Sequence, residues 1–414
     1  MNWKNKNFKW FTLFALFIFI LNLLFNLING RFCLSDFNVY YSAACNMISG
    51  SHVYNLAFGD ASGFYKYSPI SLFFFFPYTL FSYSIAGILH YIVLCLAFWY
   101  TFIMIRKILR DYFFPEYSGK TDGLLILSMI FILLYLVKEL YLGNINILLL
   151  LLCLLALQKL LNGKPIPAGI ILGVVVLTKP FFLILILPLL LRRKMKTMYA
   201  FIITLISGFV IPFIFLGLHR GLFLHQEWLG TMLLHSQAYP GVNDLYYIFR
   251  YYFSPDLPAY VGYLIIIIAG IMSSWFIIMN RRMEKKAVQI PFLWEKNFIF
   301  EWFLLLGILP DIVSTDSEHF LASAPLITFI IFFIARFKYY RVIPFLILLF
   351  FFFGGNSNDL LGTKLSHQLY IMGLLGLSNL ALIFLSVFLF LSYRSTCIRL
   401  SKSSFEALSL SALP

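Results

Sequence analysis

Residues 10–29 read WFTLFALFIFILNLLFNLIN, a stretch that contains no charged side chain. An α-helix needs about 20 predominantly apolar residues to cross the hydrocarbon core of a bilayer. Residues 85–105 and 199–217 form blocks of similar length and character. None of these blocks shows the sustained alternation of a barrel strand, and backbone polar groups in lipid must be satisfied within their own segment. The sequence therefore predicts an all-α polytopic membrane protein.

The overall composition agrees with a chain that lies mostly in a membrane. Hydrophobic residues make up 61% of the 414 positions, and charged residues make up 12%. A soluble domain carries about 25% charged residues because its surface faces water, so this chain has too few charges to cover one. We find no internal repeat, low-complexity tract or soluble segment. We therefore expect a single integral-membrane domain over residues 1–414.

The basic residues gather in short connectors between the apolar blocks. The formal net charge is +14, and its placement follows the positive-inside rule. The charge therefore reports topology and does not indicate a nucleic-acid partner. We expect both termini on the cytoplasmic side. The basic connectors include residues 106–110, 192–196, 281–286 and 336–341.

Placing these connectors in the cytoplasm predicts about twelve transmembrane helices, within a range of roughly eleven to thirteen. A first external loop, residues 30–84, is expected to carry short interfacial helices. A second external loop covers residues 218–258. The first apolar block is too long for the core of a signal peptide and lacks a small-residue cleavage site, so we expect it to be a retained span.

Two apolar stretches are not expected to cross as simple helices. Residues 69–84 are short and contain Pro77, and a crossing there would place the next basic connector outside, so we expect an interfacial helix. Residues 166–191 have basic residues at both ends and Lys179-Pro180 in the middle. We expect two short helices in a V with Lys179 at its apex. Broken helices at membrane depth are tolerated only where they line a cavity or are buried in protein.

Among the acids of the predicted external loops, Asp36 is the strongest candidate for a functional residue. From this residue onward, in DFNVYYSAA, acid, aromatic and small side chains recur at spacings of three and four. This spacing predicts a short helix against the outer mouth of the bundle. A carboxylate held there is suited to act as a general base on a hydroxyl group. The alternative is simple solvation, since acids are not drawn to the cytoplasm as lysine and arginine are.

Two lysines complement this acid. Lys66 ends the same loop, in YKYSP, and its alternative is a surface position with a snorkelling side chain. Lys179 lies within an apolar stretch, where a charge is costly and usually has a partner. Lysine also binds phosphate as a point charge. The two residues are therefore candidate phosphate ligands.

Three further features leave two interpretations open. Asn144 and Asn146, in GNIN, can bind a substrate or cap a helix. Arg250 can contact a phosphate or snorkel to the interface. His319 stands at the start of an inward helix, where it faces the cavity or belongs to a solvated turn with its acidic neighbours.

Taken together, these residues resemble the GT-C class of integral-membrane glycosyltransferases, and most closely glycosyltransferase family 87. That family comprises polyprenol-phosphate-mannose-dependent α-1,2-mannosyltransferase-like proteins. The resemblance rests on a first-loop pattern of acid, tyrosine, paired alanines, glycine and tyrosine, a Tyr/Pro segment, a Gly-Gln-x-Asn turn with Asn144 in place of glutamine, and a Gly-x-x-x-Gly stretch ending in lysine. It covers the first half well, whereas the second half matches mainly in hydropathy, Arg250 and Glu318-His319. The residues that carry it are Asp36, Tyr40, Ala43, Ala44, Gly50, Tyr54, Tyr65, Tyr67, Pro69, Pro77, Gly143, Asn144, Asn146, Gly169, Gly173 and Lys179.

The resemblance implies a GT-C-like fold and an inverting hexosyltransferase. The donor would be a polyprenyl-phosphate sugar, with mannose or another hexose or pentose, and the acceptor a lipid or glycan on the non-cytoplasmic face. Asp36 would be the catalytic base. The donor phosphate would bind Lys66, Lys179, Arg250 and His319, and the substrates would contact Tyr40, Tyr65, Tyr67, Asn144 and Asn146.

The phosphate leaving group is already a good one and we see no DxD motif, so we expect no required cofactor and leave a divalent metal open. The expected partners are the donor, the acceptor and membrane lipids, with no nucleic acid. We expect a monomer in a bacterial cytoplasmic membrane.

A transporter or flippase of lipid-linked sugars would also use broken helices and intramembrane charges, but the absence of repeats and the polar external loops favour a transferase. A non-catalytic scaffold is the third reading.

Overall fold

The computed structural model describes residues 8–58, 63–114, 121–238, 242–286, 293–313 and 316–411. The described chain is built almost entirely of helices, as the apolar blocks predict. The two strands, β1 (Ala57–Phe58) and β2 (Gly63–Phe64), form one short antiparallel pair. The protein is therefore an all-α polytopic membrane protein.

The first half of the chain contains most of the elements that surround the site described below. It comprises α1 (Lys9–Ile28), α2 (Ser35–Ser49), the 3-10 helices η2 (Pro69–Phe74) and η3 (Phe76–Leu80), α3 (Tyr83–Ile108) with the π-helical turn η4 (Leu109–Phe113), α4 (Thr121–Phe131), α5 (Leu133–Leu142), α6 (Asn146–Leu161), α7 (Pro165–Thr178), η5 (Pro180–Leu185), α8 (Ile186–Leu191) and α9 (Met195–Leu216).

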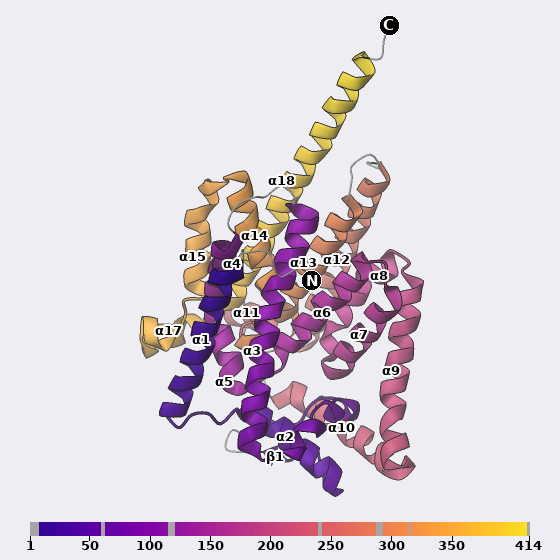
Figure 1. Cartoon of the computed structure of the whole chain (residues 1–414), viewed down its shortest axis with the longest axis vertical. Helices are drawn as coiled ribbons and strands as arrows, with labels where there is room; N and C mark the ends of the chain where they lie inside the picture. Colours follow the sequence, from indigo (N-terminus) through magenta and orange to yellow (C-terminus); the bar gives the residue numbers. More distant parts are fainter. Residues whose placement is uncertain are drawn as a thin grey trace.

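The second half supplies the remaining wall of the bundle. It comprises α10 (Leu218–Ala238), α11 (Leu245–Tyr252), α12 (Tyr260–Lys286), α13 (Leu293–Ile312), η6 (Ser317–Ser323), α14 (Ala324–Phe337), η7 (Tyr340–Val342), α15 (Ile343–Phe353), α16 (Asn358–Leu361), α17 (Thr363–Ile371) and α18 (Leu374–Ser411). Figure 1 shows α2, β1 and α10 gathered at one end of the molecule, and the C-terminal ends of α12 and α18 at the other. The bundle therefore has two distinct ends.

The prediction of about twelve spans is wrong when spans are counted by the length and composition of the helices. Among the described residues, six helices are long and apolar enough to cross a membrane: α1, α3 with η4, α9, α12, η6 with α14, and residues 374–395 of α18. A seventh would be α4 and α5 together, which are bent by 65° where they meet. The other predicted spans are α6, the two arms around Lys179 and α15, which are apolar but short, and α13.

Helix α13 fails as a plain span because it carries charged residues, among them Glu301. That carboxylate is buried and accepts hydrogen bonds from Arg192 at the end of α8, with an Nη2–Oε1 distance of 2.8 Å. Arg192 also pairs with Glu284 of α12 at 2.8 Å, and Asn280 donates to Glu301 at 2.9 Å. Buried charges of this kind are tolerated only when they are paired and hydrogen-bonded. The network joins α8, α12 and α13.

The two expected external loops contain helices. Residues 69–84 form η2, η3 and the first residues of α3, so no spanning helix lies there and the expected interfacial helix is two short 3-10 helices. Residues 218–258 contain α10 and α11. The side of the membrane on which both lie remains a prediction.

The break at Lys179 is confirmed. Helix α7 ends at Thr178, Lys179 is extended with φ −132° and ψ 101°, and Pro180 begins η5. Proline lacks a backbone N–H, its ring clashes with the preceding turn, and it pushes the residue before it out of the helical region. The proline therefore ends α7 at Thr178. Lys179 is left at the junction between α7 and η5.

Glycines allow α7 to pack closely against α9. A Cβ atom on Gly169 would lie 2.3 Å from the carbonyl oxygen of Thr197, and one on Gly173 would lie 2.6 Å from the side chain of Thr204. Small residues of this kind allow close approach of helix backbones in membranes. The position of α7, and so of Lys179 at its end, depends on this contact.

Gly169→Ala is accordingly expected to destabilise the protein by about 1–3 kcal/mol, since the added methyl group meets backbone that cannot move aside. Thermal unfolding in detergent, followed by tryptophan fluorescence, measures the shift. Gly270→Ala in α12 is the matched control, because a Cβ there meets no atom within 4 Å. Equal melting temperatures for the two variants would contradict the packing argument.

Candidate active site

A cavity of about 260 Å³ lies where α2, β2, the α5–α6 turn, the α7–η5 break, α10 and η6 meet. It brings together seven of the residues singled out from the sequence, far apart along the chain. Lining the cavity are Asp36, Tyr40, Lys66, Tyr67, Asn144, Lys179 and His319, together with Val39, Gly63, Phe64, Thr178, Pro180, Phe181, Met232, Val313 and Asp316. One acid and three basic side chains of the predicted set therefore share one space.

Asp36 lies in the first turn of α2, where the helix dipole favours a negative charge. Its Oδ2 accepts a hydrogen bond from Nδ2 of Asn144 at 2.6 Å. Burial, and to a smaller extent the charge of Glu318, raise the pKa of Asp36 to about 6 against the opposing influence of Lys179 and Lys66. The carboxyl group thus exchanges its proton close to neutral pH, as suits a general base.

The turn between α5 and α6 holds both the acid and a lysine. Gly143 has a φ of +69°, and a Cβ there would lie 2.9 Å from Cβ of Phe37, so the turn requires glycine. The side-chain oxygen of Asn144 accepts a hydrogen bond from the backbone N–H of Ile145 at 2.7 Å, which points its amide nitrogen at Asp36. Two residues on, Oδ1 of Asn146 accepts a hydrogen bond from Nζ of Lys179 at 2.5 Å.

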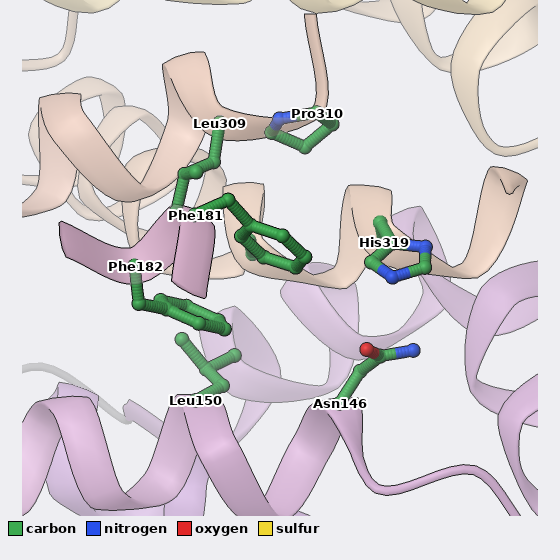
Figure 2. A pocket seen from close by; sticks show the side chains of 8 residues that line it. Asn146, Leu150, Phe181, Phe182, Leu309, Pro310 and His319 are labelled. Carbon is green, nitrogen blue, oxygen red and sulfur yellow. The ribbon is translucent and has the colours of Figure 1, made fainter. Parts of the chain in front are cut away.

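Lys179 is 5% exposed and makes a second contact inside the site. Its Nζ lies 3.1 Å from Nε2 of His319, whose Nδ1 lies 3.2 Å from the carbonyl oxygen of Asp316. A protonated lysine donates to Nε2, so the imidazole is neutral and donates from Nδ1 to Asp316. Figure 2 shows Asn146 and His319 facing each other across a small cavity bounded by Phe181 and Phe182.

Lys66 reaches the same cavity from the loop that follows β2. Burial lowers the pKa of Lys66, against the opposing influence of Asp316, Asp36 and Glu318. The indole of Trp228 in α10 donates to the backbone oxygen of Lys66 at 3.1 Å and fixes this loop. The cavity therefore presents two ammonium groups, that of the buried Lys179 and that of the partly buried Lys66.

The tyrosines form one aromatic wall. The hydroxyl groups of Tyr40 and Tyr67 lie 2.9 Å apart, and the ring of Tyr67 lies 5.5 Å from Nζ of Lys179, within range of a cation–π contact. Tyr65 is fully buried against Tyr40 and Tyr67 and is not among the residues that line the cavity. Tyr65 therefore supports the two tyrosines that line the cavity and does not reach the cavity itself.

Arg250 is not brought to the cavity. Its Nε donates to the carbonyl oxygen of Pro255 at 3.0 Å, and its guanidinium lies 5.8 Å from the ring of Tyr246. Both contacts tie it to residues close by in the chain. The role of donor-phosphate ligand suggested for Arg250 by the resemblance has no support in this arrangement.

Three charged residues outside the predicted set of site residues complete the surroundings. Lys138 donates to Ser317 Oγ and pairs with Glu318 Oε2, both at 2.8 Å, which fixes the start of η6 below His319. Glu139 is fully buried and accepts a hydrogen bond from Asn146 Nδ2 at 2.9 Å. The only signal in the sequence is an acid four residues before Gly143 of the Gly-Asn-x-Asn turn, and such an acid is expected to be solvated in an external turn. Within the described part of the chain, no group of three or more His, Cys, Asp or Glu side chains is arranged to hold a metal ion.

Comparison with known proteins gives one match. The family model of glycosyltransferase family 87 matches residues 64–293, more than half of the chain. The matched region contains Lys66, Tyr67, Asn144, Asn146 and Lys179, begins after Asp36 and ends before His319. No curated protein and no solved structure matches.

Proposed function

Because the chain belongs to glycosyltransferase family 87, we propose that it transfers a sugar from a polyprenyl-phosphate donor to a hydroxyl group of a lipid or glycan acceptor. Mannose is the first sugar to test, followed by other hexoses and pentoses. The transfer inverts the anomeric configuration, with Asp36 as the general base. No cofactor is required in this proposal, and the enzyme acts as a monomer.

One observation carries the proposal. The same turn, through Asn144 and Asn146, holds a carboxylate and an ammonium group at the wall of one cavity. A direct displacement at an anomeric carbon needs a base on the side of the acceptor and positive charge on the side of the leaving phosphate. A binding or transport site for a lipid-linked sugar has no comparable need for an acid that ionises near pH 6.

The reaction then follows from these groups. Asp36 takes the proton of the acceptor hydroxyl as its oxygen forms a bond to the anomeric carbon. The bond from that carbon to the phosphate oxygen breaks on the opposite face, and polyprenyl phosphate leaves with the electron pair. Lys179 and Lys66 stabilise the negative charge that develops on the phosphate, and His319 holds Lys179 in place. Asp36 afterwards returns its proton to solvent.

The orientation in the membrane is also part of the proposal. The basic segment 281–286 forms the C-terminal end of α12. This end of α12 and the C-terminal end of α18 lie at the end of the bundle opposite α2 and α10 (Figure 1). Basic segments favour the cytoplasmic side. The site would then face the non-cytoplasmic side of a bacterial cytoplasmic membrane, with both termini in the cytoplasm.

The test is a transfer assay with purified protein in detergent or nanodiscs. Polyprenyl-phosphate mannose and the corresponding glucose and arabinose donors are supplied with membrane lipid extract as acceptor. We expect release of polyprenyl phosphate and a glycosylated product whose linkage is of inverted configuration by NMR. If the protein instead moves intact donor across a liposome membrane without cleaving it, the protein is a flippase and the transferase proposal is wrong.

The pH dependence of transfer follows from the pKa of Asp36, which lies at about 6 and above its ordinary value of 3.8. The base works only when deprotonated, so activity is lost as the pH falls through this value. We expect kcat/KM to level off above about pH 7 and to fall about tenfold per pH unit below about pH 5.5. The donor is a phosphodiester and stays ionised throughout. An activity that stays constant down to pH 4.5, with the fold intact by thermal melting, would exclude Asp36 as the base.

A further inference from the structure

Glu139 is a buried carboxylate beside the site that the reaction just described does not use. It is fully buried near the end of α5, and it does not line the cavity. Its Oε1 accepts a hydrogen bond from the backbone N–H of Ile147, and its Oε2 accepts one from Nδ2 of Asn146, both at 2.9 Å. No ion pair to Glu139 is present among the described residues. A carboxylate placed this way requires an explanation.

The explanation lies on the other side of Asn146. Its Oδ1 accepts the hydrogen bond from Nζ of Lys179, so a single amide stands between a buried acid and a buried lysine. Both oxygens of Glu139 face N–H donors, so this side chain acts as an acceptor here, whereas an ammonium group only donates hydrogen bonds. The amide can satisfy both neighbours in one orientation alone, with nitrogen toward Glu139 and oxygen toward Lys179. The acid therefore sets the direction of the amide, and the amide sets the place of the lysine.

The position of Lys179 matters because an ammonium group has three N–H bonds to direct. Two of them are used for Asn146 and for Nε2 of His319. Among the described residues the third N–H has no hydrogen-bond partner, and Lys179 lines the cavity in which the proposed function places the donor phosphate. A rotated amide would turn its NH₂ group toward the ammonium group and displace it.

We propose that Glu139 is a positioning residue, which acts through Asn146 to aim Lys179 at the phosphate of the donor. This inference rests on the proposed function, since it assigns the phosphate as the ligand of Lys179. Glu139 itself touches no substrate. The simpler reading is that Glu139 only caps α6 through the N–H of Ile147, and the experiment separates the two.

The experiment is a double-mutant cycle at positions 139 and 146. In Glu139→Gln the side-chain oxygen still accepts from Ile147, so the cap is kept, but its NH₂ group meets the NH₂ group of Asn146. In Asn146→Asp two carboxylates face each other. In the combined variant, the new glutamine donates to the new aspartate, which accepts from Lys179, and every donor again faces an acceptor. The charge of the site is also restored.

Two measurements are made on each variant: thermal stabilisation by added polyprenyl phosphate, and KM and kcat for donor cleavage. We expect each single variant to bind polyprenyl phosphate at least tenfold more weakly and to raise the donor KM similarly, and the double variant to recover at least half of the wild-type affinity on a logarithmic scale. A cap alone predicts wild-type affinity for Glu139→Gln.

The outcomes separate the two levels of the argument. Wild-type affinity in Glu139→Gln, or a double variant no better than the worse single one, would overturn the role of Glu139. Wild-type protein that binds polyprenyl phosphate but cleaves no donor would overturn the proposed function and still allow the cycle to be read from binding. Wild-type protein that binds no polyprenyl phosphate would overturn both.

Discussion

Asp36→Asn is expected to lower kcat for sugar transfer by a factor of about 10² to 10⁴, the range that a positioned general base contributes. Asparagine keeps the size of the side chain, and its Oδ1 can still accept the hydrogen bond that Asn144 donates to the carboxylate. It has no basic oxygen to receive the acceptor proton. The donor KM should change little, because the phosphate is held by lysines. Single-turnover release of polyprenyl phosphate measures the chemical step directly.

Asp316→Asn is the matched control for this variant. Asp316 also lines the cavity, but it is exposed, so the same chemical change should reduce kcat less than about tenfold, because solvent screens exposed charges. Retention of more than a tenth of wild-type kcat in Asp36→Asn would remove Asp36 from the role of base. A large and equal loss in both variants would point to the total charge of the cavity.

The long helices could be predicted from hydropathy alone. Residues 10–29, 85–105 and 199–217 correspond to α1, α3 and α9, because an apolar run of this length has no stable alternative in lipid. The number of spans could not be predicted in this way. Window averages cannot tell a short helix buried in the bundle from one that crosses, and they do not show that Glu301 of α13 is neutralised by Arg192.

The candidate site was predicted where a local feature marked it. Pro180 marked the helix break at Lys179, and the spacing after Asp36 marked a helix near the cavity. Glu139 has only a weak local signal, because the role proposed for it depends on Asn146, at the start of α6, and through that amide on Lys179, directly after α7. Arg250 differs from these residues, since the structure shows it in contact with Pro255 and Tyr246, close by in the chain, and its role as a phosphate ligand stays a prediction.

Lys179→Met is the second change with a large expected effect. Methionine fills a similar volume without charge, so the leaving phosphate loses the ammonium group of a residue that is only 5% exposed. Removal of one preorganised donor of this kind costs about 10² to 10³ in kcat. The loss should be greatest for donors with poor leaving groups, because more negative charge then develops on the phosphate in the transition state. A series of donors with alkyl and aryl phosphate leaving groups measures this dependence.

Asn146 lies between Glu139 and Lys179, so the loss of Lys179 removes the cation nearest to the buried Glu139. A buried acid without a nearby cation is itself able to prevent folding. The combined variant Lys179→Met and Glu139→Gln removes both charges, so its thermal melting should stay close to that of the wild type while its transfer rate stays low. Lys66→Met is the matched control, because Lys66 is less buried than Lys179 and water screens its charge in part. We expect it to lose no more than about tenfold in kcat. A folded combined variant with wild-type transfer, or equal losses for the two lysines, would contradict the assignment of Lys179 as the group that stabilises the departing phosphate.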